Sequence, residues 1–183
     1  MSKKTWYILT PFIMGALIFF DQITKYWARR DLADEPFSLI KGVFGLELVQ
    51  NEGAAWGMLK GKVDFLSIIS VIMVILIAFF FYKIPVGKKY NIMHFLSIAV
   101  ISGALGNLID RIWTGSVTDF LYIELIDFPV FNVADCYITF SMFFFIILMI
   151  FYYKDEDIEF MSFKKSKVTD SGDKKDDGIQ DSD

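Results

Sequence analysis

The chain has 183 residues, enough for one domain or one compact helical bundle. It is 55% hydrophobic and 17% aromatic, with a mean hydropathy of +0.46, which is too apolar for an ordinary water-soluble domain. The formal net charge of −4 arises in residues 154–183, which hold ten acidic and six basic side chains. Residues 1–153 hold twelve of each, so the sequence shows no basic surface for nucleic acid.

The chain contains one cysteine, Cys136, and one histidine, His94. A single cysteine excludes an intramolecular disulfide and a cysteine-rich metal site. We expect His94 at the far end of the bundle from the acidic residues described below, which argues against a histidine metal centre or a serine-type triad. The sequence therefore predicts neither a metal nor a cofactor.

The N-terminal segment begins with two lysines and becomes almost continuously apolar from Trp6. A cleaved signal peptide would have this beginning, but no small-x-small cleavage site follows. The apolar run ends instead in charged and aromatic residues, which favours a transmembrane helix over about 6–27. Asp21 and Lys25 are four residues apart and can pair on one face of this helix, either as a solubilising pair or facing the interior.

Three further apolar segments are long enough to cross a membrane. The predicted fold is an α-helical membrane protein with four transmembrane helices and a small extracytoplasmic β platform after the first. Residues 31–62 would form this platform, because residues 37–50 contain short alternating pieces typical of two or three strands. The stretch 114–130 is predicted to be a loop. Spans are expected at 6–27, 63–82, 92–113 and 133–153, within one four-helix membrane domain of residues 1–153.

Two further features concern the third span and the tail. Gly103 and Gly106 would let the third helix pack closely on a neighbour. Residues 154–183 are charged and poor in large apolar side chains, which predicts a cytoplasmic tail that is largely disordered beyond about Lys164.

The distribution of Lys and Arg predicts the orientation. If both termini and the loop 83–91 lie on one side, that side holds 11 Lys and Arg against seven on the other. The richer side is expected to be cytoplasmic. Asp21, Asn51, Asp110, Asp119 and Asp135 would then lie at the extracytoplasmic face.

Asp110 ends the third apolar segment and Asp135 begins the fourth, so both carboxylates are expected at the same membrane face. A carboxylate at this depth is costly and indicates a functional site. Two close carboxyl groups share a proton, so one can act as base on a water while the other acts as acid. We therefore predict Asp110 and Asp135 as an aspartyl protease dyad.

Each aspartate also has a structural interpretation. Asp135 could cap the last helix, and Asp110 could pair with an arginine, either Arg29 or Arg111. Asn107 and Asn132 lie close in sequence to the two acids, in positions to orient carboxylates, which favours the catalytic interpretation. Cys136 has no neighbouring histidine and is interpreted as a small helix residue.

Five blocks of sequence together resemble the lipoprotein signal peptidases, also called signal peptidase II. No block is specific alone, but five in the family's order across four spans are. They are Asp21-Gln22-Ile23-Thr24-Lys25, Asn51-Glu52-Gly53-Ala54-Ala55-Trp56-Gly57, Gly103 through Arg111, Val117-Thr118-Asp119-Phe120, and Phe131-Asn132-Val133-Ala134-Asp135.

The resemblance implies an aspartyl endopeptidase of the bacterial cytoplasmic (inner) membrane, with both termini cytoplasmic and the site at the extracytoplasmic face. It would cut a prolipoprotein just before its diacylglyceryl-modified cysteine, in contact with membrane lipid, and be inhibited by globomycin. The resemblance assigns catalysis to Asp110 and Asp135. Substrate-binding or supporting roles would fall to Asn51, Gly53, Asn107, Arg111 and Asn132, and structural roles near the site to Asp21, Lys25 and Asp119. Trp56 stands where a Phe is more usual, and Ser102 where a Gly is common.

The residues alone leave three alternative functions to weigh against a signal peptidase. Intramembrane aspartates also serve as relays in carriers, but here they gather at one end of the spans. A scaffold without catalysis would tolerate Asn at position 110 or 135. An intramembrane protease of the Gly-x-Gly-Asp kind is disfavoured because Leu108 and Ile109 precede Asp110.

Overall fold

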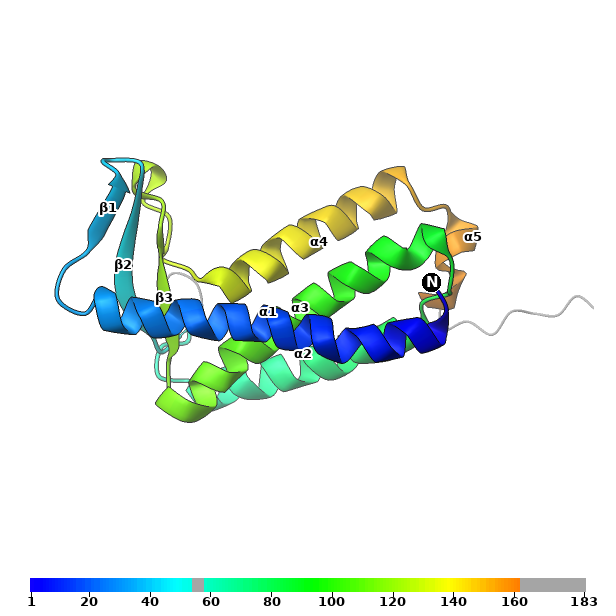
Figure 1. The fold of residues 1–183 in the computed structure, drawn as a ribbon, viewed down its shortest axis with the longest axis horizontal. Helices are drawn as coiled ribbons and strands as arrows, with labels where there is room; N and C mark the ends of the chain where they lie inside the picture. The colour runs from blue at the N-terminus through cyan, green and yellow to red at the C-terminus, as the bar shows by residue number, and fades with distance from the viewer. Residues whose placement is uncertain (54–57, 162–183) are drawn as a thin grey trace, which may run out of the picture.

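The computed structural model describes residues 1–53 and 58–161, and Figure 1 shows a bundle of long helices with a small sheet at one end. Within the described residues, four helices are long and apolar enough to cross a membrane, which confirms the predicted fold class. They are α1 (Lys3–Asp31), α2 (Val63–Lys83), α3 (Asn91–Thr114) and α4 (Val133–Phe151). Helix α1 begins before and ends after the expected span 6–27, and α4 ends before the expected Tyr153.

Helix α3 is the centre of the bundle and packs against α1, α2 and α4. In its most apolar window 67% of the residues are buried inside the protein, against 6% in α1 and α2 and 11% in α4. The outer helices therefore leave apolar side chains such as Phe12, Ile75 and Phe143 exposed. In a membrane these side chains would contact lipid.

Two glycines of α3 permit the close packing that the sequence predicted. A Cβ on Gly103 would lie 2.5 Å from the backbone oxygen of Ala134 in α4. A Cβ on Gly106 would lie 2.5 Å from Oδ2 of Asp21 in α1. Real Cβ atoms essentially never come this close to another atom. A larger residue would therefore push α4 away at Gly103 and displace the Asp21 side chain at Gly106.

The sheet is antiparallel, in the order β1 (Phe37–Ile40), β2 (Phe44–Asn51) and β3 (Val117–Tyr122). β1 and β2 confirm strands within 31–62. The prediction that 114–130 is only a loop was wrong, because β3 pairs with β2, with Gln50 opposite Thr118. That pairing joins segments far apart in sequence, and local patterns carry little information about it. Residues 54–57 of the second family-like block lie outside the described residues.

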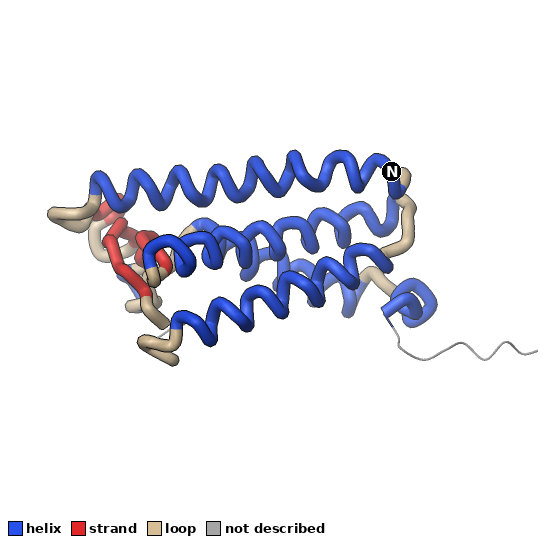
Figure 2. Tube along the Cα trace, turned by 90° about the horizontal axis from the view of Figure 1, so that it is seen from below, coloured by secondary structure: helices blue, strands red, loops and turns tan. Residues whose placement is uncertain are grey.

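At the other end, α5 (Asp155–Ile158) and the 3-10 turn η4 (Glu159–Met161) follow α4 (Figure 1). The first residues of the charged segment are therefore helical, and residues 162–183, which include the part expected to be disordered, lie outside the described chain. His94 stacks on Trp6 here, with ring centroids 4.7 Å apart, far from the sheet as predicted. Figure 2 shows the N-terminus and the strands at opposite ends. We call the end where the described chain begins and ends the termini end, and the end with the strands the sheet end.

Candidate active site

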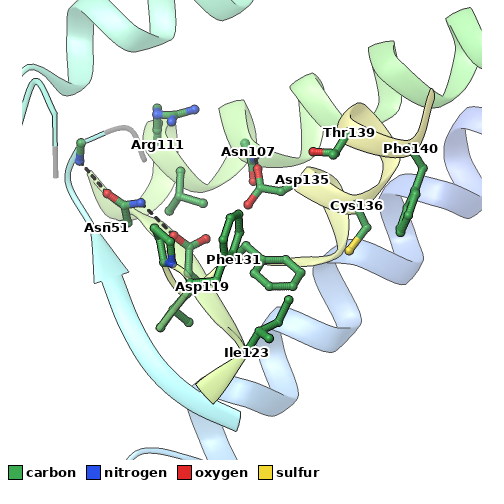
Figure 3. A pocket seen from close by; sticks show the side chains of 15 residues that line it. Asn51, Asn107, Arg111, Asp119, Ile123, Phe131, Asp135, Cys136, Thr139 and Phe140 are labelled. Atoms are coloured by element: carbon green, nitrogen blue, oxygen red, sulfur yellow. Dashed lines mark hydrogen bonds between the residues drawn. The ribbon is translucent and has the colours of Figure 1, made fainter. Parts of the chain in front are cut away.

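A cavity of about 530 Å³ opens between the sheet and the ends of α3 and α4. Figure 3 shows side chains from β2, α3, β3 and α4 converging on it. One part of its wall is apolar and includes Ile123, Phe128, Pro129, Phe131 and Phe140. The other part is polar and consists of Asn51, Asn107, Arg111, Asp119 and Asp135.

Asp135 is fixed in the first turn of α4 by a capping box. Asn132 is the N-cap: its side-chain oxygen accepts from the Asp135 backbone N–H at 3.0 Å, and its own backbone N–H donates to Asp135 Oδ2 at 3.1 Å. Asn107 of α3 donates from Nδ2 to Asp135 Oδ1 at 2.8 Å. Both asparagines therefore orient a carboxylate, as the sequence predicted, and the helix-capping interpretation of Asp135 also holds.

Asp119 lies in β3 and faces the same cavity as Asp135 (Figure 3). It is only 2% exposed. Asn51 donates to its Oδ2 at 2.8 Å, and the Asn132 side chain donates to its Oδ1 at 2.6 Å. Asn132 thus contacts both carboxylates and links β3 to α4.

The environment of Asp119 favours its protonated form. The pKa of Asp119 is raised from 3.8 to about 6, and burial is the largest cause. The hydrogen bond from Asn51 opposes this rise, and the nearby charge of Asp135 adds to it. The donor from Asn132 and the charge of Lys25 lower the pKa by smaller amounts. The Asp119 carboxyl group therefore keeps its proton at mildly acidic pH, where a free aspartate is ionised.

The environment of Asp110 differs from that of Asp119 and Asp135. It is 2% exposed and is not among the described residues that line the cavity. Its Oδ2 accepts from the Thr118 backbone N–H at 2.9 Å and lies 3.4 Å from Lys25 Nζ. Its Oδ1 accepts from Gln22 at 3.2 Å. This geometry favours Asp119 over Asp110 as the partner of Asp135.

The predicted pair of Asp21 and Lys25 is present, with Nζ 3.0 Å from Asp21 Oδ2. Both side chains are 0% exposed, so the pair faces the protein interior and is not a solubilising pair. Lys25 also donates to Asn107 Oδ1 at 2.8 Å. The predicted alternative partner of Asp110, Arg29, reaches only 4.0 Å from Asp110 Oδ1 and donates to Thr118 Oγ1 at 2.7 Å.

The remaining candidates from the sequence also lie at this site. Asn51 Oδ1 accepts from the Gly53 backbone N–H at 2.9 Å, and both residues line the cavity beside Arg111. A Cβ on Gly53 would lie 2.6 Å from the Met58 carbonyl oxygen, so only glycine fits. Cys136 lines the cavity next to Asp135, while the single histidine lies at the termini end.

Sequence reasoning missed the cavity-facing position of Asp119 and the apolar wall. The run Val117–Tyr122, rich in β-branched and aromatic residues, was the available signal for the strand that carries Asp119. The sequence analysis also missed Gln22 and Thr118, which donate hydrogen bonds to Asp110. Over residues 1–53 and 58–161 no group of three or more His, Cys, Asp or Glu side chains is arranged to hold a metal ion. The chemistry that these side chains can supply is acid–base catalysis by two carboxyl groups.

Known proteins with similar sequences point to one family. The family described as "Signal peptidase (SPase) II" matches residues 13–151. Lipoprotein signal peptidases of Staphylococcus aureus strains JH9 and Newman are each 36% identical over 154 residues, covering 82% of this chain and 93% of theirs.

Two solved structures, described as bacterial membrane enzymes obtained by the in meso method at 2.3 and 1.9 Å resolution, have the same fold. The first has a TM-score of 0.68 and 33% identity, covering 86% of this chain and 94% of its own. The second has a TM-score of 0.67 and 34% identity, covering 79% and 94%. With a family match over most of its length and relatives above 30% identity, this chain belongs to the signal peptidase II family.

Proposed function

We propose that this protein removes the signal peptide from prolipoproteins, hydrolysing the peptide bond just before a diacylglyceryl-modified cysteine. Family membership supports the activity and the class of substrate. The observation that carries the mechanism is the side chain and backbone of Asn132, which hold the Asp119 and Asp135 carboxylates at one cavity.

The proposed catalytic pair is Asp119 and Asp135, in place of the Asp110 and Asp135 expected from the sequence. With one proton shared between them, the ionised carboxylate takes a proton from water as the water attacks the scissile carbonyl carbon. The protonated carboxyl donates its proton to the carbonyl oxygen, giving a neutral tetrahedral intermediate. When the C–N bond breaks, the leaving nitrogen takes the proton that the base received. A hydroxyl of the intermediate returns its proton to the other carboxylate, which gives the carboxylic acid product and restores the pair to its starting state.

The raised pKa of Asp119, about 6, supports Asp119 as the carboxyl that carries the proton. Asp135, the other carboxyl group of the pair, would then be the base. Asn51, Asn107, Arg111 and Asn132 would orient the pair and the substrate backbone.

The cavity suits a substrate that stays in the membrane. Its apolar wall, which includes Phe128 and Phe140, would contact the signal peptide or the acyl chains. Four apolar helices make the chain a multi-pass membrane protein. We propose that it resides in the bacterial cytoplasmic membrane with both termini in the cytoplasm and the cavity at the extracytoplasmic face. Globomycin would inhibit it by occupying this cavity.

The test is cleavage of a purified, diacylglyceryl-modified prolipoprotein in detergent, followed by gel shift. We expect cleavage by the wild type, no cleavage of the unlipidated precursor, and loss of cleavage in Asp135→Asn and with globomycin. Failure of the folded wild type to cleave would overturn the proposal and favour the carrier or scaffold alternatives. Cleavage by Asp135→Asn at the wild-type rate would overturn the mechanism alone.

A further inference from the structure

We infer that Lys25, together with Asp21 and Asp110, is a positioning group that sets the orientation and separation of the two catalytic carboxylates. This inference rests on the proposed function. None of these three side chains is among the described residues that line the cavity, so none would touch the substrate. They act through backbone and amide groups that do reach the catalytic pair.

The first connection runs from Lys25 to Asp135 through Asn107. Lys25 Nζ is 2.8 Å from Asn107 Oδ1, and an ammonium group can only donate hydrogen bonds. The partner atom on Asn107 must therefore be its oxygen, so the amide nitrogen points the other way. That nitrogen donates to Asp135 Oδ1 at 2.8 Å. A buried charge thus fixes which end of the Asn107 amide faces the carboxylate.

The second connection reaches Asp119 by two routes. Asn107 Oδ1 also accepts from Asn132 Nδ2 at 3.1 Å, and the same nitrogen donates to Asp119 Oδ1 at 2.6 Å. Independently, Asp110 lies 3.4 Å from Lys25 Nζ and accepts the backbone N–H of Thr118. Thr118 precedes Asp119 in β3, so this bond fixes the strand that carries the catalytic side chain.

Asp21 completes the arrangement on the side of α4. Its Oδ1 accepts the backbone N–H of Ala134 at 3.0 Å, one residue before Asp135. Helix α1 therefore bonds directly to the backbone of α4 through Asp21. It reaches the backbone of β3 indirectly, because Lys25 pairs with Asp110 of α3, which accepts from Thr118. Gly106 leaves the space for Asp21, since a Cβ there would lie 2.5 Å from its Oδ2.

Burial makes this arrangement stiff. Lys25 and Asp21 are 0% exposed, and Asp110 is 2% exposed. A buried ammonium that loses a partner is strongly destabilised, so its acceptors cannot drift without a large penalty. Two carboxylates that must share one proton and one water need this kind of fixed geometry, because small displacements of catalytic groups slow the reaction strongly.

A purely structural role makes a different prediction from a positioning role. Loss of a structural ion pair would reduce the folded fraction but leave the turnover of each folded molecule unchanged. We expect Lys25→Met to lower kcat per folded molecule by about 100-fold, the effect of a misplacement of about 1 Å, with KM within about two-fold. Ser102→Ala is the matched control, because it removes a fully buried side-chain hydrogen bond from α3 outside this network.

The pH profile supplies a readout that a structural role would not move. Asp119 faces the charges of Asp135 in α4, Lys25 in α1 and Arg111 in α3. The ammonium of Lys25 lowers the pKa of Asp119, so its removal should raise that pKa. We expect the pH optimum of kcat/KM to move upward in Lys25→Met and to stay at the wild-type value in Ser102→Ala.

A second variant covers the case in which Lys25→Met fails to fold. The double variant Lys25→Met with Asp110→Asn removes one positive and one negative charge, so the net charge of the buried cluster is unchanged. We expect it to fold and still to lose about 100-fold in kcat, because Asn107 is no longer oriented. Wild-type kcat in this variant, or in folded Lys25→Met, would overturn the inference. An inactive wild type would instead overturn the proposed function on which the inference rests.

Discussion

The two ends of the bundle are stabilised by opposite kinds of interaction. At the sheet end, buried charges and amides such as Lys25, Asp110 and Asn132 satisfy one another in one network. At the termini end, a cluster of Ile84, Met93 and Tyr153 is buried under aromatic side chains. In the described part of the chain, one buried side-chain polar atom has no hydrogen-bond partner. It is Trp6 Nε1, which also lies at the termini end.

This contrast separates the part of the protein that sets geometry from the part that supplies packing. A polar network tolerates few alternative arrangements, because each displaced group leaves a buried donor or acceptor unpaired. Aromatic packing tolerates small shifts, because dispersion and apolar burial depend weakly on direction. We expect changes at the sheet end to alter activity and pH dependence, and changes at the termini end to alter stability alone.

The largest expected effect on stability is that of Asp119→Asn. The pKa of Asp119 in the folded protein, about 6, lies above its ordinary 3.8, so the folded state binds this proton more tightly than the unfolded state. Wild-type stability therefore falls as pH rises from 3.8 towards 6, by about 3 kcal/mol for this group. Thermal unfolding in detergent should show Asp119→Asn more stable than wild type above pH 6, with the difference closing towards pH 4.

The control for this experiment is Asp157→Asn, whose carboxyl group lies at the termini end and pairs with Lys89. The hydrogen bond from Lys89 holds the pKa of Asp157 below its ordinary value, so Asp157→Asn should not become more stable than wild type at high pH. A pH-independent difference between Asp119→Asn and wild type would contradict the environment that we describe for Asp119.

Replacement of the central glycine should come next in size. Gly103→Ala places a Cβ 2.5 Å from the Ala134 carbonyl oxygen and forces α3 away from α4. We expect a loss of about 2 kcal/mol in the free energy of unfolding, together with lower activity, because Asn107 and Asp135 would separate.

Gly15→Ala in α1 is the matched variant, since a Cβ there meets nothing within 4 Å. It should leave stability unchanged or raise it slightly, in line with the helix propensity of alanine. Equal destabilisation by the two substitutions would show that the close approach of α3 and α4 is unimportant.

A smaller effect is expected from the aromatic cluster at the termini end. Tyr90 stacks on Tyr153 with centroids 5.8 Å apart and meets the edge of Phe160. Tyr90→Leu should reduce the free energy of unfolding by about 1 kcal/mol while kcat and KM stay at wild-type values. A change in kcat per folded molecule would break the separation between the two ends.

The smallest effect should come from the ion pair of Lys89 and Asp157. Lys89 is 38% exposed and Asp157 is 18% exposed, so water screens their attraction. Near neutral pH, Asp157→Asn should leave the unfolding midpoint and the cleavage rate within experimental error. A clear loss of stability would mean that the contact of α5 with the α2–α3 loop matters more than its exposure indicates.

The sequence predicted the four spans because each is a long apolar run with charges only near its ends. It did not predict that α3 is the central helix, since hydropathy does not distinguish a helix buried in protein from one that faces lipid. The only local signal was the pair Gly103 and Gly106, which permits close packing but does not say on how many sides.

The aspartates show the same limit more sharply. Asp110, Asp119 and Asp135 all lie in family-like blocks, and nothing in the local sequence says which of them face a common cavity. That depends on the pairing of β3 with β2, which carries Asp119 over α4. Asp110 lies in α3, three residues after Asn107. Its carboxylate contacts Lys25 and the Thr118 backbone and does not line the cavity.

The central claim is that Asp119, and not Asp110, shares the catalytic proton with Asp135. The most direct test measures single-turnover cleavage of the lipidated precursor by Asp119→Asn and Asp110→Asn, corrected for the folded fraction. We predict a loss of about 1000-fold or more for Asp119→Asn, the upper range for a general acid or base, and a loss of about 10- to 100-fold for Asp110→Asn. A larger loss in folded Asp110→Asn than in Asp119→Asn would contradict the account and return catalysis to Asp110.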